Sequence, residues 1–115
     1  MSRSLLLVAA AALAFAACGK RAHDGATCEE VGARFVDLAR RQLEAAREAG
    51  DVGADAHGAV ASHVPAMRDT MVRACKEGSW SADTRGCFAK AESDTQMTTC
   101  YASMPADQRA KLEKE

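Results

Sequence analysis

The stretch TCEEVGARFVDLARRQLEAAREAG, residues 27–50, decides the fold class of this chain. Its apolar positions recur every three or four residues, which is the period of an amphipathic α-helix. The stripe runs through Cys28, Val31, Phe35, Leu38 and Gln42. Thr27 can cap this helix, Glu29 and Glu30 suit the positive end of its dipole, and Gly50 ends it. The sequence therefore predicts one long helix that buries a single face.

The segment after this helix is expected to be a loop followed by a second helix. Residues 51–62 carry Gly53 and Gly58 and predict a loop with at most one helical turn. Pro65 then favours a helix that begins near itself and runs to Lys76, because proline fits the first turn of a helix and breaks its interior.

Shorter helices are expected in the rest of the chain. Ser81 predicts the cap of a third helix that carries Cys87, and Ser93 with Asp94 separates it from a fourth, before Pro105 opens a charged C-terminal helix. The fourth helix carries Met97, Cys100, Tyr101 and Met104. No segment alternates as a strand does. The predicted fold is all-α, a small bundle of three to five short helices stapled by two disulfides, and residues 27–115 form this single domain.

The first residues have the layout of a secretion signal. Arg3 precedes an apolar run from Leu5 to Ala17, and that run is too short to span a bilayer, which needs about 20 apolar residues. Residues 1–17 are therefore expected to be a signal peptide that is removed. Residues 18–26 are polar and are expected to be a tether.

The residues before Cys18 resemble the lipobox of bacterial lipoproteins. Ala16, Ala17 and Cys18 fit that motif, and Phe15 stands where leucine is preferred. The resemblance implies that fatty-acyl groups such as palmitate are attached to Cys18, so that the chain is anchored to a membrane in the cell envelope, on the periplasmic face or at the outer membrane. The alternative is an ordinary secreted protein cut near Ala17, which leaves Cys18 as a free thiol.

The number of cysteines agrees with a lipid on Cys18. The chain has five cysteines, and an odd count in an exported protein leaves one without a partner. The remaining four allow two disulfides, and only 4% of the residues are aromatic, so a thin core makes such staples useful.

Two pairings of these four cysteines are open. If the first two helices pack antiparallel, Cys28 meets Cys75 at one end of the hairpin, and Cys87 and Cys100 flank the next turn. The rival scheme joins Cys75 to Cys87 and Cys28 to Cys100. Loop-closure entropy does not favour either scheme, because the two disulfides of each scheme together stabilise the fold by roughly 7 kcal/mol.

Spacing gives no indication of catalysis, a cofactor or a metal. No Cys-x-x-Cys pair occurs, and His23, His57 and His63 lack the spacing of a metal site. Lysines and arginines are mixed with acids along the chain, so no nucleic-acid partner is expected. Four methionines are expected to lie in the core, and the alternative is that they form a groove that adapts to binding partners. They are Met67, Met71, Met97 and Met104.

The run from Cys75 to Cys100, with Trp80 and Arg85, resembles a cysteine and tryptophan pattern in small uncharacterised bacterial lipoproteins of myxobacterial type. The resemblance implies a class of protein and no activity. The sequence thus favours a lipid-anchored, non-catalytic module of the cell envelope that binds a protein or another envelope component. The alternatives are a thiol-disulfide redox protein and a carrier of a small ligand or metal.

Overall fold

The computed structural model describes residues 25–114, so the expected signal peptide, Cys18 and His23 lie outside the described residues. The described residues form five α-helices and no strand, which confirms the all-α prediction. The helices are α1 (Cys28–Glu48), α2 (Ala54–Glu77), α3 (Ala82–Lys90), α4 (Asp94–Ser103) and α5 (Ala106–Lys114).

The first helix begins and ends where its local signals predict. The Thr27 hydroxyl accepts a hydrogen bond from the Glu30 backbone N–H at 3.1 Å, and the Glu30 carboxylate accepts one from the Thr27 N–H at 2.6 Å. This reciprocal pair satisfies two donors that the helix itself leaves free. At the other end Gly50 adopts a φ of +76°, and the N–H of Asp51 donates to the carbonyl of Ala46. Glycine takes that left-handed conformation without steric cost.

The second helix contradicts the prediction of a loop over residues 51–62 and a helix start near Pro65. α2 begins at Ala54 and carries Pro65 in its interior. Its early turns are held against α1, because Val64 is buried and His57 contacts Glu44 at 3.1 Å. Pro65 itself is exposed. Alanine is the strongest helix former, and it recurs through residues 54–61, so packing and propensity together outweigh the proline.

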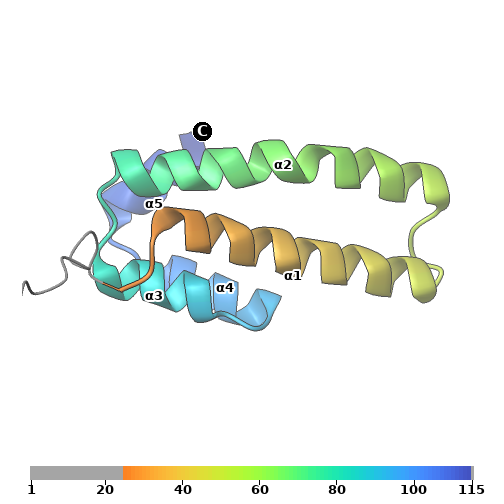
Figure 1. Cartoon of the computed structure of the whole chain (residues 1–115), viewed down its shortest axis with the longest axis horizontal. Coiled ribbons are helices and arrows are strands. Elements are labelled where there is room, and N and C mark those ends of the chain that lie inside the picture. The colour runs from red at the N-terminus through yellow and green to blue at the C-terminus, as the bar shows by residue number, and fades with distance from the viewer. Residues whose placement is uncertain (1–24, 115) are drawn as a thin grey trace, which may run out of the picture.

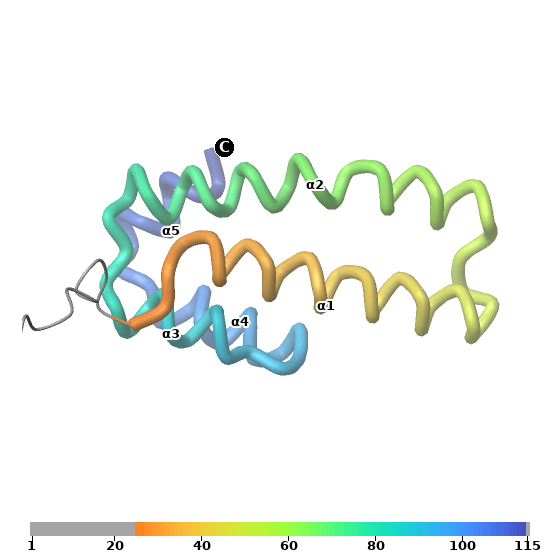
Figure 2. Tube along the Cα trace, in the orientation of Figure 1, coloured from red at the N-terminus to blue at the C-terminus, as the bar shows by residue number. Residues whose placement is uncertain are grey.

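The two long helices form an antiparallel hairpin (Figure 1). α3 packs against α1, α4 packs on α3, and α5 lies against α2. The far ends of α1 and α2 extend beyond the three shorter helices, as the trace in Figure 2 also shows. Gly32 permits the close approach of the two long helices, because a Cβ built on it would lie 2.5 Å from Cγ2 of Val72.

The core lies at the end of the hairpin that carries the shorter helices. Its buried residues are Cys28, Val31, Ala74, Cys75, Trp80, Phe88, Cys100 and Met104. The ring of Trp80 stacks on that of Phe88 with centroids 5.2 Å apart. This core, both disulfides and the helix caps all lie within residues 25–114, so this segment contains what it needs to fold on its own.

Candidate functional site

The disulfides join Cys28 to Cys75 and Cys87 to Cys100. This is the hairpin-wise pairing of the two that the sequence left open. The first bridge links the start of α1 to the end of α2, and the second links α3 to α4. The Cα atoms are 5.7 Å apart in both. Each bridge therefore fastens one helix pair at the core.

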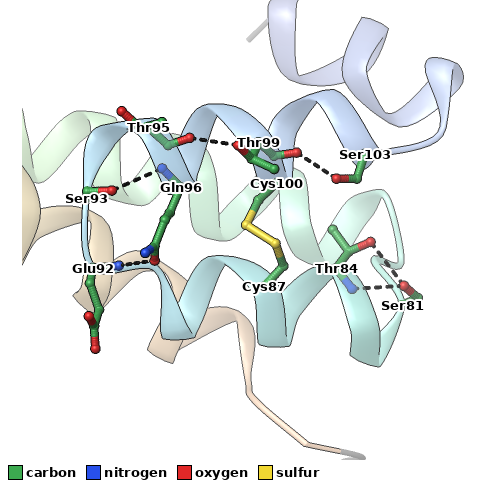
Figure 3. The surroundings of a disulfide bond; sticks show 10 residues. All are labelled: Ser81, Thr84, Cys87, Glu92, Ser93, Thr95, Gln96, Thr99, Cys100 and Ser103. Carbon is green, nitrogen blue, oxygen red and sulfur yellow. Dashed lines mark hydrogen bonds between the residues drawn. A yellow bond between two sulfur atoms is a disulfide. The ribbon is translucent and has the colours of Figure 1, made fainter.

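The two bridges differ in their exposure to solvent. Cys28 and Cys75 are 8% and 1% exposed, and Cys100 is 4% exposed, whereas Cys87 is an exposed residue. Figure 3 shows the second bridge between α3 and α4, with a hydroxyl-bearing face of α4 beside it. The second bridge therefore has one exposed residue, whereas both residues of the first bridge are enclosed by the core.

The structure holds a mainly apolar hollow of about 240 Å³ to which all five helices contribute. It is lined by Phe35, Leu38, Ala39, Gln42, Met71, Phe88, Asp94, Met97, Thr98, Tyr101 and Leu112. The polar residues of this lining, Gln42, Asp94 and Thr98, are exposed, whereas every apolar one is partly or fully buried. The hollow therefore has apolar walls and a polar rim.

A second hollow, of about 420 Å³, adjoins the first. The two share Phe35, Met71 and Leu112 as lining residues. The second also includes Met67, whose residue is 49% exposed, and His63. We call the two hollows together the apolar trough. It runs from α4 across α1 and α5 to the exposed side of α2.

Hydrogen bonds between helices hold α5 at the trough. The Tyr101 hydroxyl of α4 donates to the Glu113 carboxylate of α5, and this hydrogen bond is the largest cause that raises the pKa of Tyr101 above its usual value of 10.0. The Gln108 amide donates to the backbone carbonyl of Gly78 at 3.2 Å. These contacts place Leu112 over the trough although α5 is a short terminal helix.

An ion pair joins the same helix ends as the buried disulfide. Lys76 of α2 contacts Glu29 of α1, and its hydrogen bond is the first cause of a lowered pKa of Glu29. Both side chains are more than half exposed, so the pair adds little to stability.

The methionines and histidines occupy different places. Met71 and Met97 line the trough, Met104 is buried in the core, and Met67 stands exposed at the edge of the second hollow. The expectation that methionines are core is thus right for Met104. Of the histidines in the described part, His57 contacts Glu44 and His63 faces the second hollow.

Within residues 25–114, no three His, Cys, Asp or Glu side chains gather where they could hold a metal ion. In that same span, no helix combines the length and apolar character that crossing a membrane demands.

Sequence reasoning missed the contribution of Leu112 to the trough. This leucine stands among charged residues in α5, with no apolar neighbour at helical spacing, so periodicity gave no signal. Its isolation in a charged helix is the one feature that could have drawn attention to it.

The chain matches no protein-family model, no curated protein and no solved structure.

Proposed function

We propose that this protein is a lipid-anchored, non-catalytic module of the cell envelope that binds a protein or another envelope component at the apolar trough. The trough is the observation that carries the binding role. It is an open concave surface with mainly apolar walls, and the polar residues of the first hollow lie at its exposed rim, which is the usual arrangement of a ligand site.

The chemistry of the trough favours binding over catalysis. Its deep walls are methionine, leucine, phenylalanine and tyrosine side chains, and its one carboxylate, Asp94, is exposed at the rim. The pKa of a catalytic carboxylate is usually shifted by burial or by a charged neighbour, and an exposed position at the rim does not supply burial. Methionine side chains adapt their shape to what they contact, so such walls suit a binding partner.

The proposed anchor would keep the trough close to the membrane. Residues 18–26 can extend by at most about 32 Å, since each residue spans no more than about 3.6 Å. Thr27 starts α1 immediately after this stretch. Two or more acyl chains on Cys18 would make the attachment lasting, because one chain binds only marginally.

Intact mass spectrometry of protein extracted from membranes tests the anchor. We expect the mass of a polypeptide that begins at Cys18 and carries acyl groups. Before reduction this mass should be lower by four hydrogens than after it, because the protein has two disulfides. A Cys18→Ala protein should lose the acyl mass and leave the membrane fraction. A Cys18→Ala protein that stays in the membrane fraction would overturn the anchor.

Site-specific photocrosslinking in intact cells tests the trough as the binding site. A photoreactive amino acid that replaces Thr98 lies on the rim of the trough. The matched control carries the same photoreactive amino acid in place of Thr95, which is exposed on α4 outside the lining. We expect an adduct from position 98 in the membrane fraction and a much weaker one from position 95. Equal yields at the two positions, or none at position 98, would contradict the proposal.

A second candidate, a thiol-disulfide redox protein, is favoured by one observation, the exposure of Cys87 in its bridge with Cys100. A redox protein would exchange this disulfide with a small dithiol reversibly and pass its electrons to a second protein disulfide. A Cys87→Ala/Cys100→Ala protein that keeps its biological activity would exclude this function.

A further inference from the structure

We propose that the apolar trough binds the aliphatic chain of an uncharged, single-chain lipid, with the chain in the hollows and its head group at the rim. This inference rests on the proposed binding role of the trough and names its ligand. It does not depend on the anchor at Cys18, so the two can fail separately.

The distribution of polarity across the first hollow fits an amphiphile. Leu38 and Phe88 are buried, and Phe35, Met71 and Met97 are partly buried, so the deep walls offer only apolar contact. The rim carries an amide, a hydroxyl and a carboxylate, which can accept a hydrogen bond from a head-group hydroxyl. A purely apolar ligand would make no use of the rim groups, which are exposed and stay bonded to water, and a purely polar ligand would gain nothing from the walls.

The shape of the trough favours an elongated ligand. The first hollow has room for about eight groups of the size of a water molecule at about 30 Å³ each, and a methylene group is of similar size. The second hollow shares Phe35, Met71 and Leu112 with the first and is also lined by the exposed Met67. A single chain can therefore fill the first hollow and extend into the second. An anchor with two or more long acyl chains exceeds the first hollow, which is why we assign the site to a separate lipid.

The charges at the trough select against an anionic head group. Among the described residues that line the two hollows there is no lysine or arginine, and the rim carries the Asp94 carboxylate. Glu113 adds a second carboxylate beside Tyr101. A fatty-acid carboxylate or a phosphate would meet the like charge of Asp94 and Glu113 there, with Arg109 near Tyr101 as the neighbouring cation, whereas an alcohol would meet no such repulsion.

Titration of the oxidised segment 25–115 with octan-1-ol, decan-1-ol and decanoate tests the inference without detergent. Trp80 is the single tryptophan of the chain and stacks on Phe88, a lining residue, so its fluorescence should respond to a ligand in the first hollow. Each buried methylene strengthens binding about fourfold, so two more should lower the Kd by about fifteenfold from octanol to decanol. Decanoate should bind more weakly than decanol.

Two matched variants separate binding in the trough from binding elsewhere. Ala39→Phe fills the first hollow from α1, and Ala33→Phe makes the same change at an exposed position of α1 that lines neither hollow of the trough. We expect the first to abolish decanol binding and the second to preserve it. Should Ala39→Phe fail to fold, Leu112→Asn, on a partly exposed position of α5, removes an apolar wall of both hollows and should weaken decanol binding several-fold.

Several results would overturn the proposal. They are no saturable change with either alcohol, a Kd independent of chain length, decanoate binding as tight as decanol, or equal binding by the Ala39→Phe and Ala33→Phe proteins. A concentration-dependent dimer that decanol does not dissociate would assign the trough to a second copy of the chain instead. Loss of alcohol binding in a protein that still gives the Thr98 adduct would remove this inference and leave the binding role standing.

Discussion

A mild dithiol reductant should open the two disulfides at very different rates. Cys87 is an exposed residue, so we expect a thiolate to reach its bridge without global unfolding. Cys28 and Cys75 are 8% and 1% exposed, so their bridge becomes reachable only when the surrounding core opens. Opening that core costs up to the whole free energy of unfolding, and about 5 kcal/mol, the low end of the usual range, leaves roughly one molecule in several thousand open. We therefore expect Cys87–Cys100 to be reduced about a thousandfold faster.

The assay is timed exposure of segment 25–115 to dithiothreitol, quenching with iodoacetamide, and peptide mass spectrometry of the alkylated cysteines. Alkylated Cys87 and Cys100 should appear together, well before Cys28 and Cys75. A Cys87→Ala/Cys100→Ala protein is the control, and its remaining bridge should resist the same treatment. Equal reduction rates for the two bridges in the folded protein would refute the reasoning from burial.

Three further predictions concern stability. Gly32→Ala should destabilise the protein by about 1–3 kcal/mol in urea unfolding, because its Cβ would overlap α2, whereas Gly58→Ala, where space is open, should stabilise it by up to about 1 kcal/mol. Thr27→Ala removes the cap of α1 and should cost about 1 kcal/mol in the same assay; no loss would mean that the cap is not formed in solution. The lowered pKa of Glu29, caused first by its hydrogen bond from Lys76, adds stability at pH values above the ordinary glutamate pKa of 4.5, and this stability is lost as the pH falls through the folded-state pKa. Lys76→Met should therefore flatten the acid limb of stability measured by circular dichroism.

The parts of the fold that the sequence predicted correctly are those with local causes. The cap at Thr27, the glycine end at Gly50 and the cap at Ser81 each depend on hydrogen bonds within a few residues. Such interactions involve residues that are close in the sequence, so the local sequence pattern predicts them. The start of α2 was misjudged because Pro65 is a local signal that was overruled by contacts with α1, which lie far away in the sequence.

The trough could not be predicted for the same physical reason. Its walls come from all five helices, so it exists only after they have packed. Phe35 and Met71 fitted the apolar stripes and were expected to be core, yet each is only partly buried and lines both hollows. Leu112 is not part of an apolar stripe, so the sequence pattern did not indicate it. A sequence pattern reports which side chains turn inward, and it does not report where the inward surface is left uncovered.

The disulfide between Cys87 and Cys100 holds α4, which forms one wall of the trough, so we expect the order of this wall to depend on the redox state of the bridge. α4 contributes Met97 and Tyr101 to the first hollow, and its main packing partner is α3, to which the bridge from Cys87 to Cys100 fastens it. That bridge closes a loop across a sequence separation of 13 residues, for which loop-closure entropy gives about 3 kcal/mol. Reduction removes this constraint from α4 and leaves the bridge between α1 and α2 intact. The hairpin wall of the trough should therefore persist while the α4 wall loosens, so decanol affinity should fall after selective reduction and return on reoxidation. Unchanged affinity in the selectively reduced protein would show that packing alone holds α4 in place.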